Sequence, residues 1–242
     1  MSQDRARVLE IDEVSRVYGS GQTAVHALRP CTATLRERDF VAVMGPSGSG
    51  KTTLLQLAAG LDRPSAGEVR LRGDSLAQMT VREMTRMRRR EIGFVFQFFN
   101  LVDGLDAVEN VALPLRFDGM PGREARARAD EYIEMVGMGH RRLHLPSQMS
   151  GGEMQRIAVA RALAPRPSVL IADEPTGNLD GANSREVLSL LRDLAKKNDV
   201  AVLMATHDAG TVRYADRLWR LDDGTLVEEA VLDEDADPPS RA

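Results

Sequence analysis

The sequence predicts an α/β fold with a largely parallel sheet, an antiparallel β flank and an inserted α-helical subdomain. Short apolar runs bounded by turn residues indicate buried strands, and amphipathic helical stretches lie between them. Strands that alternate with helices favour a parallel sheet covered by helices. The third observation is a stretch from about Asn100 to Ser150, which has a helical pattern and no convincing strand.

The elements follow in chain order. We expect the antiparallel flank to comprise short alternating strands at Val8–Tyr18, Val25–Leu35 and Glu68–Leu71. We expect the buried strands at Phe40–Met44, Ile92–Phe96, Val169–Ala172 and Val200–Ala205. We expect the covering helices at Lys51–Ala59, Arg123–Val136, Gly151–Ala164 and Asn183–Lys197.

Length and composition indicate a single domain. The 242 residues are 43% hydrophobic, which is enough for a large core. We expect one domain over 1–232, with its core at about 1–97 and 165–232 and the helical subdomain at about 98–164. Residues 233–242 are an acidic tail that we expect to be disordered.

Charge and cysteine content exclude several classes of protein. The formal net charge is −4, but six acids and one arginine lie from Glu228 onward, so the body is nearly neutral and gives no argument about a polyanionic partner. The single Cys31 excludes an internal disulfide and a cysteine-based zinc site; we expect it to be buried, in a reducing cytoplasm. No apolar run approaches the ~20 residues of a spanning helix, and the start leads into no secretion signal.

A phosphate-binding loop follows the strand at Phe40–Met44. It matches the full pattern G-x-x-x-x-G-K-[ST] and opens a helix. Only three of the 32 basic residues are lysines, and the one in this loop is the only lysine before Lys196, as expected where a compact ammonium must fit between phosphates. The predicted nucleotide contacts here are Gly45, Pro46, Ser47, Gly48, Ser49, Gly50, Lys51, Thr52 and Thr53.

Two carboxylates end the strand Val169–Ala172. Beside a phosphate loop, we expect Asp173, together with the Thr52 hydroxyl, to hold Mg²⁺, and Glu174 to polarise the attacking water. Taken alone, the pair would be an acidic start of the next helix. The phosphate loop favours the catalytic interpretation, and the absence of an acceptor-binding motif favours a hydrolase over a kinase.

A second glycine loop, Ser150–Glu153, opens the helix Gly151–Ala164. Ser150 and Glu153 form a capping-box pattern, S-x-x-E. The glycines between them, Gly151 and Gly152, each cost a helix roughly 0.5–1 kcal/mol against alanine, so a cap alone does not explain them. Bare backbone at a helix N-terminus binds anions, which predicts a second phosphate contact.

With these motifs in order, the segment Met149–Arg156 resembles the signature loop of ATP-binding-cassette (ABC) ATPases, and the likeness extends over about Val8–Val231. Met149, where leucine is usual, and Glu153-Met154, where glutamines are common, depart from the family pattern. Neither departure removes a phosphate-contacting group. The resemblance implies a P-loop NTPase (RecA-like) core that hydrolyses ATP with Mg²⁺.

The resemblance also implies roles that the residues alone would not assign. Tyr18 would stack on adenine, Gln97 would reach Mg²⁺ and the water, and His207 would contact the γ-phosphate. Asp180, in the loop Gly177–Asp180, would communicate across a dimer. Taken singly, Tyr18 could be a strand aromatic, Gln97 a polar strand end and His207 a helix-capping residue.

One cassette without a spanning segment resembles the energy-coupling subunit of a transporter. It would be peripheral on the inner face of the plasma membrane through a separate permease, and would form a head-to-tail homodimer on ATP binding with the signature loop acting in trans. Details such as Gly60–Pro64 and Glu109–Leu115 are similar to the lipoprotein-release and macrolide-export group. A cell-division-type or other non-transport regulatory ABC ATPase is the alternative.

Two surface segments bear on partners. The run Arg82–Arg90 is favoured as a solvated helix face, and no nucleic-acid partner is expected. The segment Phe98–Leu101 is expected to begin a groove for a permease helix, with core packing as the alternative.

Overall fold

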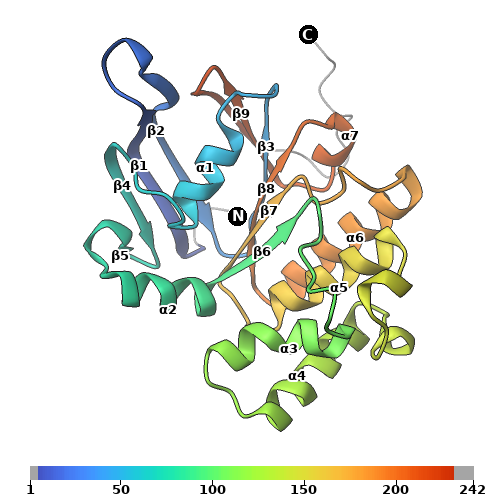
Figure 1. The fold of residues 1–242 in the computed structure, drawn as a ribbon. Coiled ribbons are helices and arrows are strands. Elements are labelled where there is room, and N and C mark those ends of the chain that lie inside the picture. Colours follow the sequence, from blue (N-terminus) through green and yellow to red (C-terminus); the bar gives the residue numbers. More distant parts are fainter. Residues whose placement is uncertain (1–4, 232–242) are drawn as a thin grey trace.

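The computed structural model describes residues 5–231 and consists of two sheets with helices between and beside them (Figure 1). The predicted acidic tail lies outside the described residues. No helix within them is long and apolar enough to cross a membrane.

The larger sheet has six strands in the order β10-β9-β3-β8-β7-β6. Neighbouring strands are parallel except for the antiparallel pair of β9 and β10. The bounds are β3 Phe40–Met44, β6 Ile92–Phe96, β7 Val169–Asp173, β8 Ala201–Thr206, β9 Arg217–Asp222 and β10 Thr225–Val231. The predicted parallel sheet is confirmed. The sequence analysis missed β9 and β10, because charged residues interrupt the apolar pattern of these strands.

The smaller sheet is antiparallel, as expected, in the order β2-β1-β4-β5. Its strands are β1 Arg7–Tyr18, β2 Val25–Arg36, β4 Ala66–Leu71 and the short β5 Asp74–Ser75. Their buried side chains, among them the predicted buried Cys31, face the larger sheet across a shared core.

Alternation along the parallel strands produces two cores. In β3, Val41 and Val43 belong to the core beneath the antiparallel sheet, whereas Phe40 and Ala42 belong to the core beneath the helices. Successive side chains of a strand point to opposite faces, so a strand covered on both faces must be apolar throughout. Because every residue of the run is apolar, both faces of this strand have to be covered.

The helices divide between the two faces. Helix α1 lies in the core between the sheets, while α3, α4, α5 and α6 cover the other face (Figure 1). The bounds are α1 Lys51–Ala58, α2 Val81–Glu91, α3 Ala107–Phe117, α4 Gly122–Met135, α5 Gly151–Leu163, α6 Gly181–Lys197 and α7 Ala209–Val212. Between β6 and β7 the chain forms no strand, which agrees with the predicted helical segment. Figure 1 shows α3 and α4 side by side, with α5 between them and the sheet.

The expected solvated face of α2 is right for Arg82, Arg86 and Arg90, which are exposed, and holds less well for Arg88 and Arg89, which are half-buried. In the last turn Arg88 donates to the carbonyl of Gly60, Arg89 to the carbonyl of Phe117, and Arg90 binds Asp118. The end of α2 therefore holds the end of α3, because arginine side chains long enough to reach water also reach the neighbouring main chain.

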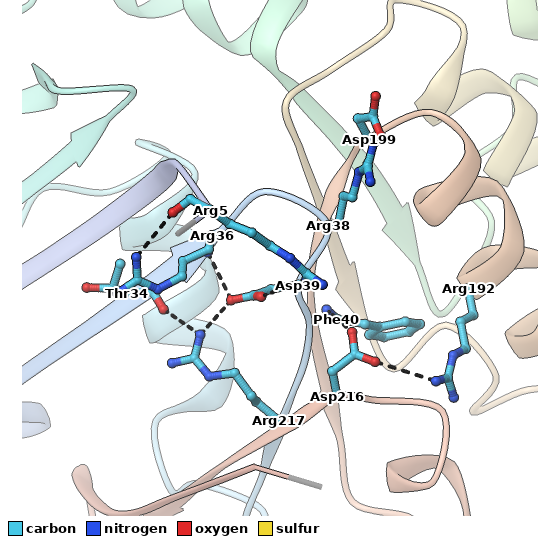
Figure 2. Close-up of polar contacts among 10 residues, drawn as sticks. All are labelled: Arg5, Thr34, Arg36, Arg38, Asp39, Phe40, Arg192, Asp199, Asp216 and Arg217. Atoms are coloured by element: carbon cyan, nitrogen blue, oxygen red, sulfur yellow. Dashed lines mark hydrogen bonds and ion pairs between the residues drawn. The ribbon is translucent and has the colours of Figure 1, made fainter. Parts of the chain in front are cut away.

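A polar network fixes the antiparallel sheet to the start of the parallel one (Figure 2). Asp39, 2% exposed, accepts hydrogen bonds from the Arg36 amide (3.0 Å) and from Nη1 of Arg217 (2.6 Å). Arg217 also donates to the carbonyl of Thr34 in β2. Beside them, Asp216 accepts the amide of Phe40. These bonds position β3 at the end opposite its phosphate loop.

Asp39→Ala should destabilise the fold by about 3 kcal/mol, because it removes a buried carboxylate that binds the Arg36 amide and the largely buried Arg217 guanidinium. Chemical denaturation measures the free energy of unfolding. Arg38→Ala, which breaks an ion pair to Asp199 with both side chains more than half exposed, is the matched control and should change it by less than about 1 kcal/mol. Equal effects of the two substitutions would contradict a structural role for the network.

Candidate functional site

The loop after β3 is shaped for a polyphosphate. A Cβ at Gly45 would lie 2.2 Å from the carbonyl oxygen of Leu221, and one at Gly50, whose φ is +102°, would lie 2.4 Å from that of Ala27. Only glycine fits at either position. The ammonium of Lys51, 7% exposed, donates to the carbonyls of Gly45 and Pro46 at 2.8 and 2.9 Å. The loop thus wraps around the lysine charge at the start of α1.

A cavity of about 620 Å³ adjoins this loop. It brings together the phosphate loop, the acid after β7 and the histidine after β8, as the carboxyl ends of neighbouring parallel strands require. Its lining residues are Val25, His26, Ala27, Ser47, Gly48, Gly50, Lys51, Thr52, Thr53, Glu174, His207 and Asp223. No motif in the sequence marks the first residues of β2, or Asp223, as part of this cavity.

A smaller cavity of about 330 Å³ shares Thr52 and Glu174 with the first and adds Asp173 and Gln97. The hydroxyl of Thr52 donates to Oδ2 of Asp173 at 3.3 Å. Burial raises the pKa of Asp173, and the neighbouring Glu174 adds to the rise, while Thr52 and Lys51 oppose it. A cation at this corner would favour the ionised carboxylate that burial disfavours.

The second acid is held in an unusual backbone conformation. Glu174 has φ +47°, in the left-handed region, and its amide bonds the carbonyl of Ala205 in β8. Its Oε1 lies 2.9 Å from Nδ1 of His207. Strained non-glycine residues of this kind are over-represented at active sites. In this conformation the carboxylate lies against the histidine, and Glu174 lines both cavities.

The second glycine loop lies elsewhere. Its capping box is present, with the Ser150 side chain accepting the amide of Glu153 and the Glu153 side chain accepting the amide of Ser150. None of Ser150, Gly151, Gly152 and Glu153 is among the residues that line the two cavities. The two predicted phosphate loops therefore do not meet in either of these cavities.

Asp180 begins α6 and is occupied by its own helix. Its carboxylate accepts the amides of Ala182 and Asn183 and the side-chain amide of Asn183. These bonds hold the pKa of Asp180 below its ordinary value. A Cβ on Gly152 would come within 2.6 Å of the Asn183 amide oxygen, so the first turn of α6 packs against the second glycine loop.

Tyr18 lies at the edge of the first cavity and is not among its lining residues. It pairs with Val25, which does line the cavity. The Arg16 guanidinium covers one ring face at 4.5 Å, and the hydroxyl donates to Asp62 at 2.7 Å. The side chain is 38% exposed, so the aromatic is anchored and half accessible.

Two residues of α5 escaped the sequence analysis. Gln155 is fully buried and donates to the carbonyls of Phe96 and Pro175. These two hydrogen bonds connect the end of β6 to the segment that follows β7. Arg161 donates to the carbonyls of Phe99 and Asn100, whose φ values are +58° and +49°. Burial lowers the pKa of Arg161. A buried polar residue in a helix was the available signal, but only the fold shows its partners.

Comparison with known proteins agrees with this geometry. The family model described as "ABC transporter" matches residues 28–177. The lipoprotein-releasing system ATP-binding protein LolD of Chromohalobacter salexigens is 47% identical over 92% of this chain and 94% of its own length. The macrolide export ATP-binding/permease protein MacB of Marinobacter nauticus is 42% identical over 92% of this chain and 34% of its own length.

Among solved structures, the dimeric post-hydrolysis state of the ATP-binding cassette MJ0796, bound to ADP and Pi, superposes with a TM-score of 0.84. It is 39% identical and covers 93% of this chain and 99% of its own. With a phosphate loop, Glu174 and His207 converging on one cavity, the chain belongs to the ABC transporter family, as an ATP-binding, ATP-hydrolysing subunit similar to LolD.

Proposed function

We propose that two copies of this chain close head to tail on ATP and drive export or extraction by a separate membrane permease. The separation of the two glycine loops supports this proposal, because the second loop lines neither of the two cavities beside the first. Each site would take Lys51, Thr52 and Glu174 from one copy and Ser150–Glu153 from the other. The dimeric MJ0796 cassette and the similarity to LolD favour the same arrangement.

Within each site the residues have distinct tasks. The loop amides and Lys51 would bind the phosphates, and the Glu174 carboxylate would accept a proton from the attacking water. His207 would orient that carboxylate through Nδ1 and contact the γ-phosphate. Tyr18 would stack on adenine with the ring face that Arg16 leaves uncovered, and Asp180 would fix the start of α6 at the contact with the other copy.

Mg²⁺ fits the corner formed by Thr52, Asp173 and Gln97. Hydroxyl, carboxylate and amide oxygens are hard ligands, and Mg²⁺ usually takes few protein ligands besides substrate phosphates. The described residues contain no group of three or more His, Cys, Asp or Glu side chains that could hold a metal alone, in keeping with that habit. When bound, the ion would neutralise phosphate charge beside the acid pair.

The permease would dock on a groove of about 420 Å³ between α2, β6, α3 and α5. Its lining includes Arg88, Arg89 and Arg161 and no carboxylate, and is otherwise largely apolar. An apolar helix with an acidic side chain complements such a surface. The groove shares Phe96 and Asn100 with the catalytic corner, so an occupant would touch the segment that follows Gln97. The chain would then sit on the inner face of the plasma membrane through the permease.

Glu174→Gln should bind ATP with nearly unchanged affinity and hydrolyse it at least about a hundredfold more slowly, because the amide cannot accept the proton. Phosphate release and titration with a fluorescent nucleotide measure the two quantities. Turnover at the parent rate would show that another group activates the water.

A mixture of Lys51→Ala and Gly151→Asp chains, each inactive alone, should recover part of the ATPase activity. A hybrid dimer contains one site with both halves intact, so up to about half of the paired sites' activity returns in that hybrid. The control is a mixture of two Lys51→Ala preparations, which should stay inactive. A dead hybrid mixture would mean that the second loop does not act in trans.

Phe98→Ala should weaken association with the permease by about tenfold or more, since Phe98 is 71% exposed and lies two residues before Asn100, which lines the groove. Phe98 also lines the smaller cavity, so ATP binding is measured in parallel and should stay intact. Phe98 is a better test residue than Phe99, because the Phe99 ring lies 3.6 Å from the Cβ position of Gly151. Val81→Ala, at an exposed valine outside the groove lining, is the control. Co-purification in detergent measures the effect. Parent-like association of the Phe98 variant would remove this segment from the interface.

A further inference from the structure

The second glycine loop contains a charge that opposes its proposed task. Gly151 and Gly152 present backbone amides at the start of α5, where the helix dipole favours an anion. Glu153 closes the same turn with a carboxylate. That carboxylate is good for the helix, because it completes the capping box, but it repels a phosphate that approaches the same amides.

Two basic side chains lie against this carboxylate. Nε of Arg141 donates to Oε1 of Glu153 at 2.8 Å, and Nε2 of His140 lies 4.0 Å from the same oxygen. Both come from the short 3-10 turn Gly139–Arg141 that follows α4. The Arg141 and Glu153 side chains are only 33% and 22% exposed, so water screens the pair less than it screens a surface pair.

The carboxylate is held on both oxygens. Oε2 accepts the Ser150 amide at 2.7 Å while Oε1 faces Arg141. The bond from the Ser150 amide, and then the bond from Arg141, keep the pKa of Glu153 below its ordinary value. Glu153 is therefore charged at neutral pH, and protonation does not relieve the conflict with a phosphate.

The capping box does not need an arginine for its own sake. Helix α2 begins with the same box, formed by Thr80 and Glu83, and no ion pair to Glu83 is found within residues 5–231. At the start of α3 the same box has a basic neighbour, Arg126, whose 49% exposed side chain lies 3.6 Å from Glu109. The box therefore forms with or without an arginine, and at the second glycine loop the arginine is closer, at 2.8 Å, and less exposed.

We propose that Arg141 is a positioning and charge-compensating residue of the second glycine loop. Its guanidinium neutralises and holds Glu153, so that the amides of Gly151 and Gly152 can donate to the terminal phosphate of ATP bound to the other copy. The inference rests on the proposed two-chain site. It explains how the chain tolerates a charged Glu153 at a position where the family pattern commonly has a neutral glutamine.

The test uses ATP-dependent dimerisation of the Glu174→Gln chain, measured by sedimentation equilibrium with Mg²⁺ and ATP. Adding Arg141→Ala should raise the dimer dissociation constant by about tenfold or more, because like charges that face each other across an interface are costly. Adding Glu153→Gln to that chain should restore dimerisation to within about threefold of the parent, since the repelling charge is gone.

Arg142→Ala is the matched control. It removes the same charge one residue later, from an ion pair with Asp130 at 3.7 Å, and should leave the dissociation constant within about twofold of the parent. Raising the salt concentration should narrow the gap between the Arg141→Ala chain and its parent, because salt screens a repulsion and does not repair a damaged fold. Thermal unfolding of the Arg141→Ala chain, and binding of a fluorescent nucleotide by its monomer, should match those of the parent.

Two results would overturn the inference: parent-like dimerisation of the Arg141→Ala chain, or no recovery when Glu153→Gln is added. Neither result bears on the ATP-dependent dimer of the Glu174→Gln parent. Failure of the Glu174→Gln parent to dimerise with ATP would instead overturn the proposed two-chain site, and this inference with it.

Discussion

Charge balance at the carboxyl ends of the parallel strands is the constraint on which the rest of the structure depends. The same sheet edge holds a loop shaped for a polyphosphate and two adjacent acids, Asp173 and Glu174. Negative charge would therefore accumulate there when a nucleotide binds. Three features can offset that negative charge: Lys51 in the loop, His207 beside Glu174, and the oxygen-lined corner suited to Mg²⁺. Burial raises the pKa of Asp173, and the neighbouring Glu174 adds to the rise, so this carboxylate gains most from a nearby cation.

The pairing of Arg141 with Glu153 follows the same logic at the other loop. In both places a carboxylate has a local task, the proposed proton acceptance at Glu174 and helix capping at Glu153, and in both a basic group lies against it. A protein that closes around a polyanion can keep acids nearby only when each one is compensated. This makes the charge partners of the acids as informative about function as the phosphate-binding residues.

Helix α5 connects these regions mechanically. It begins at the second glycine loop, reaches the ends of β6 and β7 through Gln155, and holds the carbonyls of Phe99 and Asn100 through Arg161. The groove proposed for the permease is lined in part by Arg161 and Asn100. One rigid element therefore touches the loop that would contact the other copy, the strand ends that carry the acids, and the segment that would meet the membrane subunit.

The sequence by itself determined the parallel core, the antiparallel flank, the helical segment and the family, because these depend on local periodicity and on motifs whose residues are contiguous. The loop Gly45–Thr52, the acid pair and the capping box at Ser150 needed only a few neighbouring residues to be recognised. Strands β9 and β10 did not follow from the sequence, since charged side chains such as Arg217 make polar contacts across the fold and hide the apolar pattern. Only the tertiary structure decided the contacts of Glu174 with His207, of Arg161 with the segment after Gln97, and of Arg141 with Glu153. Such contacts join side chains that the order of the sheet and the packing of helices bring together, and no pattern within a single segment specifies them.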